Sequence, residues 1–330
     1  MHYQFQELTT IPLSDRERID QTISVDHVAV ALSALHRDGI VCLANAVDLE
    51  HIDLLNSILS AEAEEMAQLP TTHFNDTGGR ERQTGNMSQG PPLQPDLMFQ
   101  DIWANGPATT VISSLLGPRP RVNYVNGNTA LGGYSGARQG VHADLTFNHG
   151  LFPFGLVTNY YLVDTSVENG GTELWLGTHR NTSFADHKEC MPNAAEGVEL
   201  GIREELLQQR REYAPPIHAT VKRGSVVIRD LRLWHAGVSN PSPRPRIMLA
   251  FVHTPWWYQC PGRVVLPESA RGLVESWAAG DMPVVYNAHY VPAPIDHKNV
   301  AFIPDFSSRN EGFRSQLPDL PPGFIFGAKQ

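Results

Sequence analysis

His142, Asp144 and His235 are the residues of this chain whose types and spacing most directly indicate chemistry. Two imidazoles and one carboxylate that leave part of a metal's coordination sphere open form the facial triad of non-heme Fe(II) oxygenases. Side chains on a β-strand repeat every second residue, so His142 and Asp144 can present two ligands on one face. The third ligand must then come from a distant strand that passes beside the first, which is the place expected for His235.

The His-x-Asp/Glu pattern occurs four times, at His36/Asp38, His51/Asp53, His142/Asp144 and His187/Glu189. The first two lie in predicted helices over 24–38 and 48–67, where residues two apart point to different sides. The fourth lies in a polar stretch without a strand pattern. Only the third has β-like segments on both sides, at 121–125 and 156–163, so the period of the flanking sequence singles out His142 and Asp144.

Composition limits the class of protein. The 330 residues include 27 Gly and 25 Pro, and only 18% are charged, which is typical of a turn-rich β fold. A net charge of −10 argues against a nucleic-acid partner, because binding a polyanion needs a basic surface. The most natural partner is therefore a small-molecule substrate, and the sequence leaves a homodimer open.

Cysteine usage and hydropathy indicate the compartment. The three cysteines, Cys42, Cys190 and Cys260, are widely spaced and form neither a disulfide framework nor a zinc signature. The first residues lack a signal-peptide pattern, and no apolar run approaches the roughly 20 residues of a membrane span. We therefore expect a cytoplasmic protein that does not enter a membrane.

The order of the predicted elements favours an all-β core with helical elaboration, specifically a double-sheet, cupin-like jelly roll rather than a parallel α/β sheet. Predicted strands are 121–130, 141–147, 156–163, 172–176, 217–221, 225–231 and 246–254, and predicted helices are 24–38, 48–67, 107–116, 202–211 and 267–279. We expect one domain over 1–330. It comprises a mainly helical N-terminal part (1–118), the β core (119–254), and a C-terminal helix with a wrapping tail (255–330). The polar stretch 71–96 fits a lid or a plain surface loop equally well.

Two segments resemble the phytanoyl-CoA dioxygenase-like family. One is Arg229-Asp-Leu-Arg-Leu-Trp-His-Ala-Gly-Val-Ser-Asn240 followed by Arg246, which is similar to the end of that family's core. The other is Tyr161 to His179, which resembles its Asp…Glu-Asn-Gly…Gly-Ser-His block, with Thr178 in place of the usual Ser. Members are Fe(II)- and 2-oxoglutarate-dependent oxygenases on a double-stranded β-helix, and they include fatty acyl-CoA hydroxylases and enzymes that tailor natural products. The resemblance covers roughly residues 120–255.

The resemblance implies Fe(II), 2-oxoglutarate and O₂ as cofactors and cosubstrates, with ascorbate supporting activity in vitro. It makes His142, Asp144 and His235 the iron ligands and Arg246 the partner of the distal carboxylate of 2-oxoglutarate. A guanidinium suits that role because it pairs with a carboxylate through two parallel hydrogen bonds. Thr172 and Gln139 are further candidates for contacts with the cosubstrate. Related enzymes often place a hydroxyl two residues after the second His, where this chain has Gly237.

Other residues near the motifs fit supporting roles. Asp230 and Arg232 are expected to form a local ion pair that supports His235. His179 is more consistent with bracing a loop than with binding metal. Trp256 and Trp257 suit either a substrate pocket or core packing.

These observations predict an oxidoreductase of secondary metabolism that oxidises a small metabolite, such as a natural-product intermediate. Hydroxylation, epoxidation, desaturation and oxidative cyclisation remain open. The alternatives are a cupin-type metal enzyme that does not use 2-oxoglutarate and a non-catalytic jelly-roll binding protein. The missing His-x-His ligand set counts against the first, and the retained ligands and Arg246 count against the second. A CoA thioester would need a phosphate site, for which the basic residues Arg203, Arg210, Arg211, Lys222 and Arg223 are candidates.

Overall fold

The computed structural model describes residues 7–75, 83–144, 152–188, 201–292, 295–299 and 306. Its helices are α1 (Asp15–Ile19), α2 (Val25–Asp38), α3 (Leu49–Gln68), α4 (Gln100–Trp103), α5 (Gly106–Leu116), α6 (Glu204–Tyr213) and α7 (Arg271–Ala279). Its strands are β1 (Thr10–Pro12), β2 (Ile40–Ala44), β3 (Asn86–Ser88), β4 (Arg121–Ala130), β5 (Leu156–Tyr161), β6 (Glu173–Leu174), β7 (Ile217–His218), β8 (Val226–Asp230), β9 (His235–Ala236), β10 (Arg246–Thr254), β11 (Val264–Pro267), β12 (Val285–Tyr286) and β13 (Ala288–Val291). Short 3₁₀ turns include η3 (Thr178–Arg180).

Capping residues set the bounds of the first long helices. The Ser24 side chain accepts a hydrogen bond from the His27 N–H at the start of α2, and Asp48 caps α3 in the same way. Helix α2 ends at Gly39, which has a left-handed φ of 79°. A Cβ at Gly39 would also lie only 2.5 Å from Nδ1 of His179, so this position needs glycine for two reasons. The predicted helices at 24–38 and 48–67 are therefore confirmed to within a residue.

The core of the protein is an eight-stranded mixed sheet, which we call the large sheet. Its strand order is β1-β2-β8-β5-β10-β4-β12, with β3 paired to β4. The β1–β2 and β12–β4 pairs are parallel and the other pairs are antiparallel. Strands β1, β2, β3 and β12 come from outside residues 119–254, so segments before and after the predicted β core contribute to the sheet.

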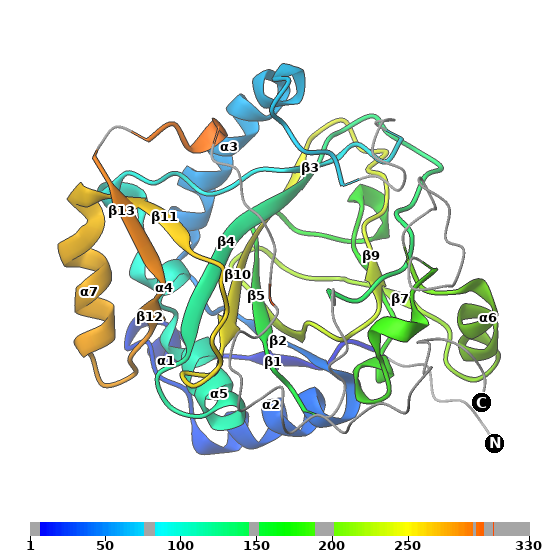
Figure 1. Ribbon diagram of the computed structural model, residues 1–330, viewed down its shortest axis with the longest axis horizontal. Helices are drawn as coiled ribbons and strands as arrows, with labels where there is room; N and C mark the ends of the chain where they lie inside the picture. Colours follow the sequence, from blue (N-terminus) through cyan, green and yellow to red (C-terminus); the bar gives the residue numbers. More distant parts are fainter. Residues whose placement is uncertain are drawn as a thin grey trace, which may run out of the picture.

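The two faces of the large sheet have different surroundings. Its outer face packs against α2, α3, α5 and α7 through one large apolar cluster that includes Val41, Ile228, Tyr160, Leu249 and Phe251. Figure 1 shows these helices gathered on one side of the sheet. An all-β description is therefore too narrow, because a helical layer forms half of the main core. The alternate residues of the same strands form the inner face, which faces a second, smaller sheet.

The smaller sheet has the order β7-β6-β9 and lies across the interior from β4, β10 and β5 (Figure 1). Its strands are only two residues long, shorter than the predicted 172–176 and 217–221. His142 joins this side of the interior through a single antiparallel bridge to His235 rather than through a continuous strand. Part of the predicted strand 141–147 and of the stretch 71–96 lies outside the described residues, as does the C-terminal tail over 300–305 and 307–330.

One predicted helix starts later than expected. The pattern predicted a helix over 267–279, but α7 begins at Arg271. The preceding Val264–Pro267 is β11, which pairs in parallel with β13. This pairing joins segments that are distant in the sequence, and periodicity over a local window does not report it.

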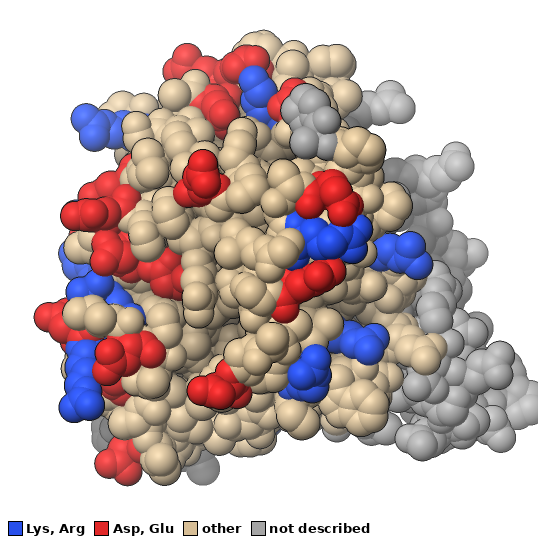
Figure 2. All heavy atoms as spheres, turned by 90° about the vertical axis from the view of Figure 1, so that its left-hand side faces the viewer, with Lys and Arg blue, Asp and Glu red and all other residues tan. Residues whose placement is uncertain are grey.

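The surface beside α7 carries both signs of charge in small groups. Figure 2 shows Asp and Glu side chains scattered over this face, with Lys and Arg next to them rather than in a continuous basic area. Arg271, for example, pairs with Glu268 and Glu275, and Lys298 pairs with Glu65. Among the described helices, none has the combination of length and apolar character that a bilayer span requires.

Candidate metal centre and cosubstrate site

The structure brings His142, Asp144 and His235 together, and we call these three residues the triad. One potential ligand atom from each residue lies within 4.8 Å of the others. The backbones of His142 and His235 exchange two hydrogen bonds of 2.9 Å, and the Asp144 N–H donates to the Leu231 carbonyl at 2.8 Å. Two segments far apart in the sequence are thereby fixed side by side, as the strand period of the His-x-Asp pair predicted.

The hydrogen bonds of the two imidazoles fix which ring nitrogen can bind a metal. Nδ1 of His142 lies 2.8 Å from the Gly140 carbonyl, and Nδ1 of His235 lies 3.0 Å from the Leu233 carbonyl. A carbonyl only accepts, so each Nδ1 carries the proton and each Nε2 keeps a lone pair. Both Nε2 atoms lie 3.8 Å from the same oxygen, Oδ1 of Asp144. The three donor atoms therefore converge on one point.

Arg229 is the residue that organises this cluster, and the sequence analysis did not identify it. Its Nη2 donates to Oδ2 of Asp144 at 2.8 Å, and its Nη1 lies 3.3 Å from Nδ1 of His235. Burial by itself raises the pKa of Asp144, but the positive charge of Arg229, with that of the two imidazoles when they are protonated, outweighs burial and holds this pKa well below its usual range. Burial, together with Arg229, lowers the pKa of His235. An ionised Asp144 and a neutral His235 are the protonation states that metal ligands need.

His187 supports the chain between the first two triad residues. It is buried, and its Nε2 accepts a hydrogen bond of 3.2 Å from the Ala143 N–H. Because Ala143 lies between His142 and Asp144, this bond fixes the backbone that carries both side chains. Nothing in the local sequence indicated the contact, since it spans 44 residues.

Arg246 lies on the inner face of β10 and is only 1% exposed. Its Nη1 donates to the backbone carbonyl and the side-chain oxygen of Asn128, and its Nη2 donates to the Gly170 carbonyl. Its Nε has no hydrogen-bond partner. None of the described carboxylates lies within ion-pair distance of this guanidinium. A buried charge that lacks a counter-ion is costly, so the site is suited to an anionic ligand.

Comparison with known proteins places this arrangement in a family. The phytanoyl-CoA dioxygenase (PhyH) family matches residues 35–248, about two thirds of the chain, a range that includes the triad and Arg246. The chain belongs to the PhyH family. The enzyme class and cofactors expected from the sequence, a dioxygenase that depends on Fe(II) and 2-oxoglutarate, are those of this family.

Solved structures show the same fold at low sequence identity. EctD from S. alaskensis, crystallised with 2-oxoglutarate and 5-hydroxyectoine, is 18% identical with a TM-score of 0.53, over 82% of this chain and 88% of EctD. The epimerase SnoN, in complex with Fe³⁺, α-ketoglutarate and nogalamycin RO, is 16% identical with a TM-score of 0.51, over 83% and 98% of the two chains. The carbocyclase SnoK from nogalamycin biosynthesis is 16% identical with a TM-score of 0.50, over 71% and 84%.

In this PhyH-family chain, Thr172 and Gln139 have different surroundings. Glu173 pairs with Ala236 and Leu174 with His235, so the same register places Thr172 opposite Gly237, on the face that His235 occupies. Tyr161 of β5 pairs with Met248, two residues from Arg246 on the same face of the large sheet. Burial raises the pKa of Tyr161, and the charge of Arg246 and a hydrogen bond with Thr172 oppose that rise.

Both polar ends of the Gln139 side chain are engaged with the protein. Its Oε1 accepts from the Gly237 N–H at 2.7 Å, and its Nε2 donates to the Asn75 carbonyl. A Cβ at position 237 would lie 2.5 Å from this Oε1, so the glycine leaves room for Gln139. A contact between Gln139 and the cosubstrate therefore stays a prediction. It would require the Gln139 side chain to give up its hydrogen bond with Gly237 or with Asn75.

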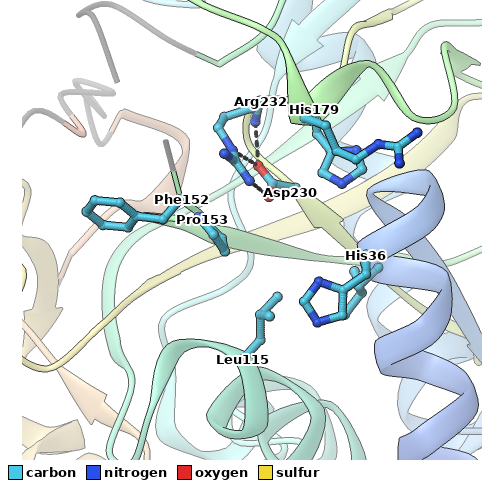
Figure 3. Close-up of a pocket in the computed structure, with 9 residues that line it drawn as sticks. His36, Leu115, Phe152, Pro153, His179, Asp230 and Arg232 are labelled. Carbon is cyan, nitrogen blue, oxygen red and sulfur yellow. Dashed lines mark hydrogen bonds and ion pairs between the residues drawn. The ribbon is translucent and has the colours of Figure 1, made fainter. Parts of the chain in front are cut away.

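Asp230 and Arg232 form the expected local ion pair, through bonds of 2.7–2.9 Å, but they face a different part of the protein from the triad. They line a separate pocket of about 180 Å³ together with His36, His179 and Phe152 (Figure 3). It is Arg229, not this pair, that contacts His235 directly. Arg229 and Asp230 are successive residues of β8, and successive side chains on a strand point to opposite faces, so only Arg229 points toward the triad.

Proposed function

We propose that this protein is an Fe(II)- and 2-oxoglutarate-dependent oxygenase of a small metabolite, in which the triad binds iron and Arg246 binds the distal carboxylate of 2-oxoglutarate. The observation that carries the proposal is the combination of two features in one interior. Three donor atoms converge with part of a coordination sphere left open, and a buried guanidinium lacks a carboxylate partner. Two facing sheets around this interior are the arrangement of a double-stranded β-helix, which we propose as the fold type.

The residues fit the iron by their chemistry. Two neutral imidazoles and one carboxylate suit Fe(II), and both Nδ1 protons are already held by backbone carbonyls. Arg229 occupies Oδ2 of Asp144, so Oδ1 is the oxygen left for the metal. With iron bound, 2-oxoglutarate and O₂ would supply the oxidising chemistry.

The residues around Arg246 fit a carboxylate. Its hydrogen bonds to Asn128 and Gly170 fix the guanidinium plane, and Tyr161 and Thr172 lie beside it. We propose that Arg246 orients the cosubstrate and that the Thr172 hydroxyl assists. The apolar residues of the inner face, among them Val157 and Val252, exclude water from the bound reactants.

The family description makes an acyl-CoA thioester a second candidate substrate. The basic residues that could bind CoA phosphates are already engaged with the protein. Arg203 pairs with Glu205, Arg211 with Glu204, Lys222 with Asp164 and Arg223 with Asp53, and Arg210 donates to the Leu176 carbonyl. This pairing favours a small free metabolite, such as an intermediate in natural-product biosynthesis.

The test is an assay of succinate formation with Fe(II), ascorbate, 2-oxoglutarate and candidate substrates. The proposal predicts succinate release that depends on iron and requires Asp144, with Asp144→Ala as the control. A cupin-type enzyme without 2-oxoglutarate, or a binding protein, would release none. Product mass then separates the outcomes: gain of one oxygen indicates hydroxylation or epoxidation, and loss of two hydrogens indicates desaturation or ring closure.

A further inference from the structure

Phe306 lies far beyond the β core in the sequence but is buried against it. Its ring meets Tyr124 edge to face, with ring centroids 5.6 Å apart and planes at 85°. The Tyr258 hydroxyl donates to the Phe306 carbonyl at 2.8 Å. Phe306 also belongs to the apolar cluster that contains Val157 and Val252 of the inner face. A side chain and a backbone contact together hold this residue at the interior.

Tyr124 connects Phe306 to the triad. It lies on the inner face of β4, opposite Val252 of β10. Its hydroxyl accepts a hydrogen bond of 2.8 Å from the Asn126 side-chain amide. The apolar cluster that contains Phe306, and against which Tyr124 packs, also includes Ala143, between His142 and Asp144, and Ala236, next to His235. Both rings therefore lie beside the segments that carry the triad.

The inner face offers little charge to a substrate. Among its described side chains on β5, β8, β10 and residues 122–130 of β4, only Arg229 and Arg246 are charged, and Arg121 lies at the exposed start of β4. Arg229 is bound to Asp144, and Arg246 is reserved for a carboxylate in the function proposed above. The other polar groups include the amides Asn126, Asn128 and Asn159. Met248 and Ala250 keep some exposure at the centre of the sheet, whereas their outer-face neighbours are fully buried.

We propose that Phe306 and Tyr124 form an apolar wall of the substrate site beside the triad, and that the substrate is a neutral molecule that places an apolar face against this wall. The inference rests on the proposed function, because it assumes a metal at the triad. It makes Phe306 a specificity-determining residue, although the core motifs end far before it. A neutral substrate that offers hydrogen bonds to the amides and an apolar surface to the two rings matches the groups available.

The first test measures whether Phe306 adjoins the metal. Fluorine at the para position of Phe306, introduced as 4-fluorophenylalanine, is observed by ¹⁹F NMR with Zn(II) and then Co(II) in the protein. Paramagnetic Co(II) broadens and shifts only nearby nuclei. We expect a broadened or shifted signal at position 306 and a much smaller change for the same label at Phe99, which stacks on His51 on the helical side. Tyr258→Phe, which releases the Phe306 carbonyl, should reduce the cobalt effect at 306.

The second test uses the space that Phe306→Ala would open. We expect 4-fluorotoluene to occupy that space, so its ¹⁹F relaxation should be accelerated by the cobalt form of Phe306→Ala and much less by the cobalt form of the wild type. The zinc form of Phe306→Ala corrects for binding without the paramagnetic effect. Phe306→Leu keeps most of the apolar volume and should behave like the wild type.

The outcomes separate the two proposals. If Co(II) binds, as judged by its visible absorption, but neither fluorine probe responds to it, the wall assignment is wrong and the metal site stands. If the wild-type protein binds no Co(II) and Asp144→Ala gives the same result, the proposed function itself fails. A response at 306 that equals the response at Phe99 would also overturn the inference.

Discussion

Arg229 binds the carboxylate of Asp144 through a 2.8 Å hydrogen bond while its other terminal nitrogen lies 3.3 Å from the ring of His235. One buried cation thus contacts two of the three triad residues. It holds Oδ2 of Asp144 and leaves Oδ1 facing both Nε2 atoms. The position of this arginine is therefore a condition for the geometry of the metal site.

Arg229→Ala should weaken metal binding. Loss of a partner that orients a metal ligand typically lowers metal affinity roughly 10- to 100-fold. Arg229→Lys keeps the charge but not the planar fork, so an intermediate loss is expected. Co(II) titration followed by calorimetry measures the effect, with the exposed ion-pair variant Arg223→Ala as the control. Wild-type affinity in Arg229→Ala would show that Asp144 holds its orientation without the arginine.

Arg246→Met should remove most of the affinity for 2-oxoglutarate and leave metal affinity unchanged. Loss of one partner of a buried charge pair costs about 2–5 kcal/mol, or roughly 30-fold or more in the dissociation constant. In the metal-loaded wild type, 2-oxoglutarate should raise the unfolding temperature, and this rise should be lost in the variant. An unchanged dissociation constant for 2-oxoglutarate would assign the carboxylate to another basic residue.

His187→Ala should lower both stability and metal affinity. It leaves the buried Ala143 N–H without its acceptor, which costs about 1–3 kcal/mol. His187→Gln offers an amide oxygen and should recover part of the loss. Thermal unfolding of the apo protein and Co(II) titration give the two readings, and a normal metal affinity in a destabilised His187→Ala protein would restrict His187 to a structural role.

His253 should make stability depend on pH. Burial lowers its pKa from 6.5 to about 4, with its hydrogen bonds to backbone carbonyls opposing the shift. The unfolded chain therefore binds the proton first, so the stabilisation is present above about pH 6.5 and is lost as the pH falls toward 4. The loss is on the order of 3 kcal/mol. Urea unfolding at several pH values should show that the free energy of unfolding depends less on pH in His253→Gln than in the wild type. An unchanged pH dependence would mean that other groups cause it. His36→Gln, at an exposed histidine, serves as the control.

Long elements with a regular pattern could be predicted from the sequence. Strands β4 and β10 occur over the predicted residues, since strand-forming segments of ten and nine residues give a strong local signal. The two-residue strands β6, β7 and β9 are defined by pairing with distant segments, and β11 is a strand only because β13 lies beside it. Local periodicity contains no information on such partners.

The same distinction applies to the site. The grouping of the triad could be predicted because its residue types have a specific chemistry at a specific spacing. The role of Arg246 was inferred from the resemblance to a known family and stays a prediction. Arg229 was overlooked in favour of Asp230 and Arg232, although the strand period from Val227 places Arg229 on the inner face. The contacts of His187 with Ala143 and of Phe306 with Tyr124 depend on tertiary packing, which no local pattern of the sequence reports.

The central claim is that iron binds at His142, Asp144 and His235 with 2-oxoglutarate held by Arg246. A crystal structure of the protein grown anaerobically with Fe(II) and 2-oxoglutarate, with data collected at the iron edge, tests it most directly. We predict one strong anomalous peak bonded to Nε2 of both histidines and to Oδ1 of Asp144, with the distal carboxylate of 2-oxoglutarate on the Arg246 guanidinium. An iron peak away from the triad, or 2-oxoglutarate bound without contact to Arg246, would contradict the account.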